Sequence, residues 1–238
     1  MYGHHPVTTA LANPRRHIRR ILAVETELAR LPGRVVAERT DPAALGALLP
    51  AGAVHQGVAA LVDPLPMIDL TELLDDIPAD GPAHLLVLDQ VTDPQNVGAI
   101  LRSAAAFGAR GLVLTERHAA PESGALAKAA SGALDLLPLV RVVNLARAIE
   151  ALKEAGFWCL GLAAEGEATL AEAKAPDRVA LVLGSEGTGL RRLTREHCDQ
   201  LVRLPTFGAI DQLNVSNAAA VALYELVRDR PSSRPGPA

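Results

Sequence analysis

The sequence predicts an α/β protein with two parts, a small N-terminal α/β domain and a larger domain built on a parallel β-sheet. From residue 84 onward, short apolar runs alternate with helical segments, which is the pattern of parallel strands joined by helices. Such strands read as nearly continuous apolar runs because helices cover both faces of the sheet. Before them, a stretch rich in proline and acidic residues lacks periodicity and predicts a linker. We therefore expect domains at 1–64 and 83–230, a linker at 65–82 and a disordered tail at 231–238.

The composition excludes several classes of protein. The chain has 238 residues, of which 49% are hydrophobic and 21% charged, so we expect a globular cytoplasmic protein and not a disordered one. No apolar run approaches the roughly 20 residues that a membrane span needs. Aromatic residues make up 3%, which argues against a protein that stacks exposed bases on rings. Cys159 and Cys198 share no CxxC spacing, so we expect reduced thiols, with neither a disulfide nor a metal site.

Short elements alternate in the N-terminal domain. Apolar and β-branched residues predict strands, and Asp41 followed by Pro42 predicts an N-cap and first helical residue. The predicted helices cover 7–12, 25–31 and 42–49, and the predicted strands cover 18–24, 34–40 and 54–62.

Four arginines lie within six positions of the N-terminal domain: Arg15, Arg16, Arg19 and Arg20. The whole chain has a net charge of −4, but residues 1–62 contain seven Arg and no Lys against four acidic residues, a balance of +3. Phosphate binding needs a local positive patch and not a basic average. The cluster is therefore either an RNA-binding patch or a solvated turn and strand edge, since charge runs are common on surfaces.

In the larger domain, the residues that follow the strands are the best candidates for a site. The linker contains one expected short helix, at 71–75. The expected strands cover 85–89, 112–115, 158–163, 179–184 and 200–205. Open parallel sheets bind ligands at the carboxyl ends of their strands, which directs attention to three segments.

The first segment is a helix that follows the strand at 85–89. Asp93 is an N-cap type, Pro94 suits the first helical position, and Gly108 is a natural stop. Gly98 and Arg102 lie one turn apart. A glycine there either leaves room beside the guanidinium for a large anion such as an RNA phosphate, or marks a contact between helices.

The second segment is a glycine-rich loop that follows the strand at 179–184. Gly184, Gly187 and Gly189 let a ligand approach the backbone closely. The loop has no Lys-Ser/Thr pair for a P-loop, and its glycine order differs from the dinucleotide fingerprint. Glu186 argues against a bare pyrophosphate and favours a cation or a neutral nucleoside, of which the sulfonium of S-adenosylmethionine is one candidate. A tight structural turn is the alternative.

The third segment enters the last predicted helix, at 215–228. Asn214 and Ser216 are capping residue types, which is their ordinary explanation.

Together, the segments NVGAILR, LVLGSEGTGL and LP…LNVS resemble the three signature motifs of the SpoU/TrmH family of SPOUT RNA methyltransferases. The resemblance extends over residues 1–230 and is strongest to bacterial members that methylate a guanosine ribose in large-subunit ribosomal RNA. It implies a parallel sheet with a deep C-terminal trefoil knot within about 180–228, and S-adenosylmethionine bound in that knot. It also implies a homodimer whose active site is shared across the interface, and an RNA-binding role for the N-terminal domain.

The resemblance also implies roles for individual residues. The expected cofactor contacts are Leu183, Gly184, Gly187, Leu204 and Leu213. The expected catalytic residues are Asn96, Arg102, Glu186 and Asn214. Arg102 is placed at the ribose hydroxyl as a base or a phosphate clamp. We favour the clamp, because the pKa of a guanidinium lies above ~12.

One position departs from the family pattern, since Gln212 stands where the family usually has serine. Two alternatives follow. The chain is a transfer-RNA or other ribosomal-RNA methyltransferase of the same family, or a non-catalytic RNA-binding or ribosome-assembly protein that retains the fold. Gln212 supports the second alternative, and the four expected catalytic residues oppose it. A nucleotide-binding oxidoreductase lacks support because its glycine pattern is absent.

Overall fold

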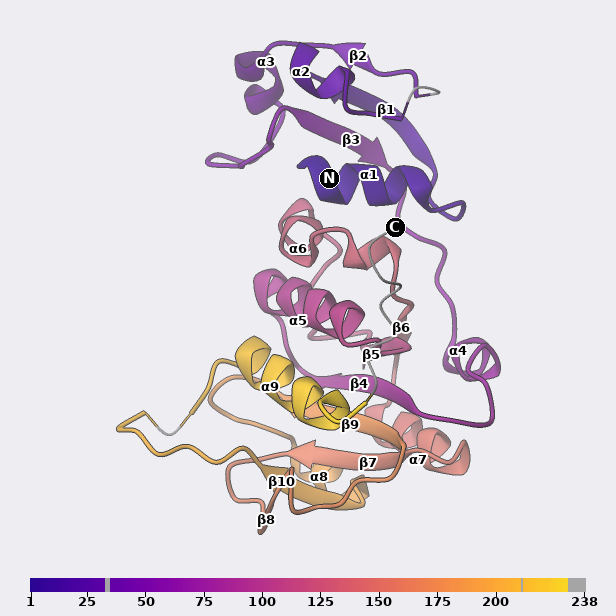
Figure 1. Ribbon diagram of the computed structural model, residues 1–238, viewed down its shortest axis with the longest axis vertical. Coiled ribbons are helices and arrows are strands. Elements are labelled where there is room, and N and C mark those ends of the chain that lie inside the picture. The colour runs from indigo at the N-terminus through magenta and orange to yellow at the C-terminus, as the bar shows by residue number, and fades with distance from the viewer. Residues whose placement is uncertain (33–34, 211, 231–238) are drawn as a thin grey trace.

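The computed structural model describes residues 1–32, 35–210 and 212–230. Within these residues the chain forms a small three-stranded sheet and a large seven-stranded sheet. The small sheet lies in the N-terminal domain, and the large sheet forms the centre of the second domain (Figure 1). The predicted α/β class and its division into two parts therefore agree with the structure.

In the N-terminal domain the strand order is β2-β1-β3, with β1 parallel to β2 and antiparallel to β3. The strands are β1 (Ile18–Ala23), β2 (Glu38–Arg39) and β3 (Val58–Val62). The helices are α1 (His4–Ala12), α2 (Glu25–Leu28) and α3 (Pro42–Ala47).

Two strand predictions in this domain were too long. Of the strand expected at 34–40, only β2 forms, and Arg34 lies outside the described residues. The strand expected at 54–62 begins at Val58, because Gln56 and Gly57 have φ values of 52° and 79° and make a turn. The predicted cap of α3 is confirmed, since the Asp41 carboxylate accepts hydrogen bonds from the amides of Ala43 and Ala44.

The large sheet has the order β6-β5-β4-β9-β7-β10-β8, and all of its neighbouring strands are parallel. Two of the strands, β6 and β8, are absent from the sequence prediction. The strands are β4 (Ala83–Asp89), β5 (Gly111–Thr115), β6 (Leu139–Val142), β7 (Trp158–Leu162), β8 (Ala168–Thr169), β9 (Arg178–Gly184) and β10 (Gln200–Arg203).

Helices cover both faces of this sheet (Figure 1). On β4, Leu86 and Leu88 face the core beneath α5, α6 and α9, whereas Leu85 and Val87 face the core beneath α4 and α7. The helices are α4 (Leu70–Asp75), α5 (Pro94–Ala106), α6 (Gly124–Ala130), the 3-10 helix η1 (Ala133–Asp135), α7 (Leu145–Glu154), α8 (Arg192–His197) and α9 (Val215–Val227).

Gly98 on α5 serves a contact between helices. A Cβ atom there would stand 2.6 Å from the Leu126 carbonyl oxygen and 2.6 Å from the Ala129 Cβ atom, both on α6. The space beside Gly98 is therefore filled by α6. The hypothesis that this glycine leaves room for an RNA phosphate beside Arg102 is wrong.

The two domains meet where α1 packs on α6 and η1. Arg16 of the N-terminal domain donates to the Asp135 carboxylate at 2.7 Å, and the two side chains are 2% and 1% exposed. Asn13 also donates to Asp135, at 3.1 Å. A buried charge that loses its partner is costly, so this ion pair strongly favours one relative position of the domains.

The segment expected to be a linker, 65–82, follows the edge of the large sheet. Ile68 forms an isolated parallel bridge with Val140 of the edge strand β6, and Leu73 of α4 is buried against Gly111 of β5.

Both cysteines are free, and burial raises the pKa of the Cys159 and Cys198 thiols to about 12. No described helix combines the length and the apolar character that crossing a membrane requires.

His84, at the start of β4, predicts a pH dependence of stability. Burial, and then the charge of Arg230, lowers its pKa to about 4, and the Arg230 guanidinium donates to His84 Nε2 at 3.0 Å. In the unfolded chain the pKa is about 6.5, so between pH 6.5 and 4 only the unfolded state takes up this proton. The free energy of unfolding should be unaffected by His84 above pH 6.5 and should fall through this window as the pH drops, by at most about 1.4 kcal/mol per pH unit.

Denaturant titrations at several pH values, run on the wild type and on His84→Gln, isolate this contribution from that of the carboxylates. The variant should show the shallower slope between pH 6.5 and 4. Parallel slopes would contradict the assignment.

Candidate active site

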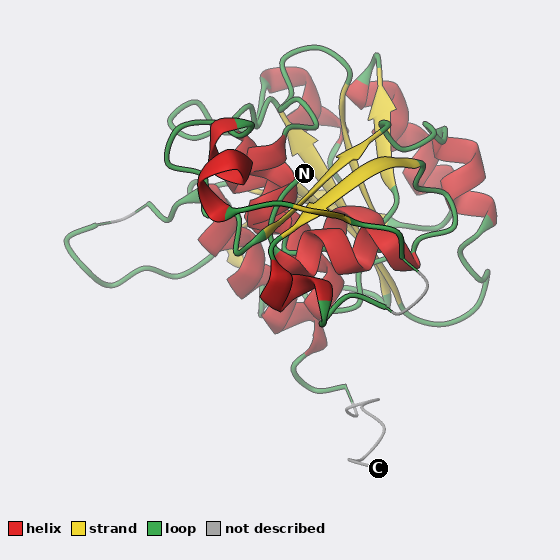
Figure 2. Cartoon of the chain, turned by 90° about the horizontal axis from the view of Figure 1, so that it is seen from above, coloured by secondary structure: helices red, strands yellow, loops and turns green. Residues whose placement is uncertain are grey.

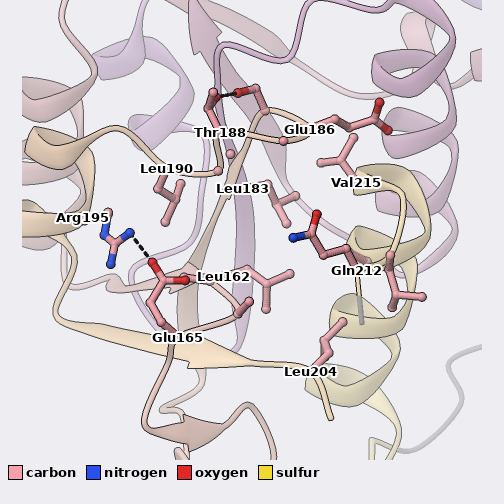
Figure 3. Close-up of a pocket in the computed structure, with 18 of the residues that line it drawn as sticks. Leu162, Glu165, Leu183, Glu186, Thr188, Leu190, Arg195, Leu204, Gln212 and Val215 are labelled. Carbon is pink, nitrogen blue, oxygen red and sulfur yellow. Dashed lines mark hydrogen bonds and ion pairs between the residues drawn. The ribbon is translucent and has the colours of Figure 1, made fainter. Parts of the chain in front are cut away.

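A pocket of about 240 Å³ opens at the carboxyl ends of β7 and β9, beside the residues that follow β10 and the start of α9 (Figure 3). This is the edge at which parallel sheets bind ligands. One part of the wall is apolar, and its side chains come from segments that are far apart in the sequence. The apolar side chains are Leu162, Leu183, Leu190, Leu204, Leu213 and Val215.

The glycine-rich loop after β9 forms another part of the wall. A Cβ atom on Gly184 would stand 2.1 Å from the carbonyl carbon of Gly189, so the loop folds back directly onto the end of the strand. The Gly189 amide donates to the Ser185 carbonyl at 2.9 Å, and the hydroxyls of Ser185 and Thr188 are 2.6 Å apart. Gly187 has a φ of 83°, and nothing lies within 4 Å of where its Cβ would be. The loop is therefore closed on itself and leaves backbone accessible from the pocket.

Asp89 anchors the chain that follows this loop. Its carboxylate is fully buried at the end of β4 and accepts from the Arg191 amide at 2.9 Å and from Arg191 Nε at 2.6 Å. This ion pair fixes the position of Arg191, which follows Gly189 by two residues. The loop is thus held at both of its ends by the large sheet.

All five residues expected to contact a cofactor line this one pocket. Leu162, Glu165 and Arg195 also line it, although the sequence motifs did not indicate them. Glu165 and Arg195 form an ion pair at one side of the pocket, opposite Leu204 and Gln212 (Figure 3). Glu165 follows the predicted strand at 158–163, so the rule about carboxyl ends of strands was the signal that could have found it.

Three of the four expected catalytic residues form one polar cluster. Glu186 Oε1 accepts from Asn96 Nδ2 at 3.2 Å and from Asn214 Nδ2 at 2.5 Å. Asn214 Nδ2 also donates to Asn96 Oδ1 at 3.0 Å. These residues come from α5, the glycine-rich loop and the start of α9, so the tertiary fold brings together positions 28 to 118 residues apart.

Asn214 has two roles at once. Its Oδ1 accepts from the Ser216 amide at 2.9 Å and from the Ser216 hydroxyl at 2.5 Å, which caps α9. Its Nδ2 reaches the carboxylate of Glu186. The capping explanation is confirmed for Asn214, and it is compatible with the cluster because the two ends of the amide serve different partners. Ser216 is not the cap, since it lies inside α9 and its hydroxyl donates to Asn214.

Arg102 stands apart from this cluster. It lies six residues after Asn96 on α5, so the two side chains point about 120° apart around the helix. Its side chain is exposed and does not line the pocket. Among the described residues, no hydrogen bond or ion pair holds its guanidinium. Within one chain, Arg102 therefore lies outside the pocket wall, exposed and with no described side chain neutralising its charge.

Gln212, at the unusual position, lines the pocket, and its amide points toward the pocket's centre (Figure 3). Residues 206–210, between β10 and α9, project from the body of the protein (Figure 2). Phe207 and Ile210 in this segment are 96% and 79% exposed.

Fewer of the four clustered arginines are accessible at the protein surface than the sequence indicates. Arg16 is buried in its ion pair with Asp135 and is not accessible to RNA, because it joins the two domains. Arg19 donates to Asp63 at 2.5 Å, and Arg20 to Glu38 at 2.6 and 2.7 Å, in exposed ion pairs. Arg15 is exposed and donates to the Pro66 carbonyl at 3.2 Å.

Two family profiles match the chain. The profile described as the SpoU rRNA Methylase family matches residues 83–224, and the profile described as RNA 2'-O ribose methyltransferase substrate binding matches residues 1–67. The fold, the pocket and these two matches define the class of protein as a two-domain RNA methyltransferase. The chain belongs to the SpoU rRNA methylase family.

Relatives of known sequence support the same assignment. The chain is 42% identical over 246 residues to an uncharacterized tRNA/rRNA methyltransferase of Synechocystis, covering 99% of this chain and 64% of the relative. It therefore spans less than two thirds of that relative's length. It is 45% identical over 179 residues to the 23S rRNA (guanosine-2'-O-)-methyltransferase RlmB of Escherichia coli, covering 75% of this chain and 74% of the relative.

Solved structures share the fold of this chain, one over both domains and another over part of the chain. The SpoU methyltransferase AviRb of Streptomyces viridochromogenes, in complex with the cofactor AdoMet, has a TM-score of 0.79 and 30% identity, and the match covers 98% of this chain and 91% of that one. A structure on the 2-OH methylation of tRNA has a TM-score of 0.56 and 31% identity, with 95% of its chain covered. That second match covers 62% of this chain, so this protein has substantial structure beyond it.

Proposed function

We propose that this protein transfers a methyl group from S-adenosylmethionine to the 2'-hydroxyl of a guanosine ribose in large-subunit ribosomal RNA, in the cytoplasm. The observation that carries the proposal is the polar cluster of Asn96, Glu186 and Asn214, because Glu186 belongs both to this cluster and to the pocket wall. The similarity to ribosomal RNA guanosine methyltransferases supports the choice of substrate. So does the presence of an RNA substrate-binding domain.

The pocket fits S-adenosylmethionine, which supplies the methyl group when it is bound. Its leucine-rich wall suits an adenine ring, and the open backbone at Gly187 allows a ligand to approach the loop closely. Glu165 and Arg195 carry the two charges that a zwitterionic amino-acid end requires. Leu183, Gly184, Gly187, Leu204 and Leu213 remain the proposed cofactor contacts.

The chain's own residues supply orientation and charge. A ribose hydroxyl is a poor nucleophile at neutral pH, so positioning and removal of its proton have to supply the catalysis. Asn96 and Asn214 hold the Glu186 carboxylate at the edge of the pocket, where it orients the groups that react. Arg102 clamps a phosphate of the RNA, since its free guanidinium offers a fork of donors that matches phosphate oxygens.

The direct test uses the purified protein, labelled S-adenosylmethionine and an unmodified transcript of large-subunit ribosomal RNA. We expect the label in the RNA at one ribose, located by mapping 2'-O-methylation. Transfer to transfer RNA alone would replace the proposed substrate. Cofactor binding without transfer to any RNA would support the alternative of a non-catalytic RNA-binding protein.

We also propose that the protein acts as a homodimer in which Arg102 of one subunit completes the site of the other. Arg102 does not line the pocket of its own chain, and α9 carries exposed apolar side chains at Val221 and Tyr224, 48% and 55% exposed. Light scattering measures the mass in solution. A monomer that is fully active would overturn this proposal.

A trefoil knot within about 180–228 remains part of the proposal. The order β9-β7-β10 supports it, because the chain passes beyond β7 after β9 and then returns to the α5 side of the sheet as α9. Pulling the chain from both ends in a single-molecule experiment tests it. A knotted chain should extend to less than its full contour length, and full extension would contradict the knot.

For RNA binding we propose Arg15, Arg19 and Arg20, and exclude Arg16. Changing these three arginines to glutamine together should weaken RNA binding and flatten its salt dependence, because each lost phosphate contact lowers the slope by about 0.7–0.9. Binding is measured over a series of salt concentrations, with Arg147→Gln on the opposite face of the large sheet as the control. An unchanged slope would favour the interpretation of this cluster as an ordinary charged surface.

A further inference from the structure

Helix α6 lies between the catalytic helix α5 and the N-terminal domain (Figure 1). The turn of α6 at Leu126–Ala130 packs against Gly98 of α5, two residues from Asn96. On its other side, α6 meets the N-terminal domain, where a Cβ on Gly124 would stand 2.9 Å from the Tyr2 ring. Helix α6 therefore links α5 to the N-terminal domain and lies at the boundary between the two domains.

Lys128 is the basic residue of α6, and it reaches across the boundary between the domains. Its ammonium donates to the Gln56 side-chain oxygen at 2.6 Å, and the His4 amide donates to the same oxygen at 3.3 Å. A Cβ on Gly3 would stand 2.6 Å from Lys128 Nζ. Gly3 thus leaves room for this ammonium, which would have to shift if the residue carried a Cβ.

The backbone around this contact is unusual. Gln56 has a φ of 52° and Gly3 a φ of 98°, and both residues adjoin the ammonium. A left-handed residue other than glycine costs free energy, and such residues concentrate at functional sites. The turn at Gln56 presents its side-chain oxygen to Lys128, which is a specific use for the unfavourable conformation.

The charge of Lys128 is not balanced locally. Of the chain's three lysines, Lys153 bonds to Glu150 and Asp199, whereas no carboxylate pairs with Lys128 among the described residues. Its one protein partner there, Gln56, is neutral, and burial lowers the pKa of Lys128. An ammonium carries three donors, so two remain for another partner.

We propose that Lys128 binds a phosphate of the RNA substrate at the boundary between the two domains, with Gln56 as the residue that positions its ammonium. The inference rests on the proposed function, which supplies the RNA. A phosphodiester fits because the site offers an uncompensated positive charge and free donors, beside a domain that binds RNA substrates in this family.

Lysine footprinting tests this directly, because the chain contains its own controls. The full-length protein is acetylated with a limiting reagent, with and without the ribosomal RNA transcript, and each lysine is quantified by mass spectrometry. We expect RNA to reduce acetylation of Lys128 several-fold and to leave Lys153 and Lys174 unchanged. RNA that binds, seen as a gel shift, but leaves Lys128 unprotected would overturn the assignment. A wild-type protein that binds no RNA at all would instead contradict the proposed function.

Two variants separate phosphate binding from a purely structural contact. Lys128→Gln should weaken RNA binding by about three- to tenfold and reduce the salt slope by about one phosphate contact, while S-adenosylmethionine affinity stays unchanged. Lys128→Arg should retain most of the binding because it keeps the charge. Equal loss in both variants, together with a lowered melting temperature, would show that Lys128 only joins the domains.

Discussion

Replacing Arg102 with alanine is expected to lower methyl transfer by at least about two orders of magnitude while leaving the affinity for S-adenosylmethionine nearly intact. The first effect follows because the variant loses the charged group that we propose holds the reacting nucleotide, and such losses cost about 10²–10³ in rate. The second follows because Arg102 does not line the pocket. Single-turnover kinetics and calorimetry measure the two quantities separately.

The matched control for this experiment is Arg147→Ala. Arg147 is exposed on α7, on the opposite face of the large sheet, so its loss removes the same charge from the protein without touching the site. Equal loss of turnover and of cofactor binding in Arg102→Ala would refute the role assigned to Arg102.

Arg102→Lys distinguishes a phosphate clamp from a base. A lysine holds a phosphate as a point charge. If Arg102 is a clamp, the Arg102→Lys enzyme should therefore keep part of its activity, and its pH–rate profile should not shift. A base would lose protons at a lower pH after this change, because the pKa of lysine is about 10.4 and that of arginine is above about 12. A profile displaced toward lower pH would therefore favour the base.

Gly184→Ala is expected to have the largest effect on the cofactor pocket. The new Cβ would stand 2.1 Å from the Gly189 carbonyl carbon and 2.3 Å from the Leu190 nitrogen, and these backbone atoms have to move. Because Asp89 and Arg191 hold the chain beyond the loop, the displacement should pass into the pocket wall. We expect the affinity for S-adenosylmethionine to fall by more than tenfold and the free energy of unfolding by about 1–3 kcal/mol or more.

Gly208→Ala is the control, since it adds the same methyl group near the pocket but nothing lies closer than 3.9 Å to the new atom. Calorimetric titration and denaturant unfolding of both variants give the comparison. Wild-type cofactor affinity in Gly184→Ala would show that the glycine-rich loop does not hold the methyl donor.

Local sequence patterns were sufficient for the elements that carry the site. The buried strands β4 and β9 read as continuous apolar runs, and Asp93 and Asn214 are caps whose side chains bond the first amides of α5 and α9. Strands β6 and β8 were missed because neither contains a continuous apolar run that stands out in the sequence: Arg141 interrupts β6, and β8 has only two residues. Such strands depend on their neighbours in the sheet more than on their own composition.

The sequence by itself determined the class of fold, the three segments that carry the site and the family. These features follow from apolar periodicity, capping residues and motif order, which are local properties of the chain. Only the tertiary structure decided that Glu186 meets Asn96 and Asn214, that Arg16 is buried against Asp135, and that α6 fills the space at Gly98. The physical reason is that these contacts join residues 28 to 119 positions apart, and strand order and domain packing bring them together.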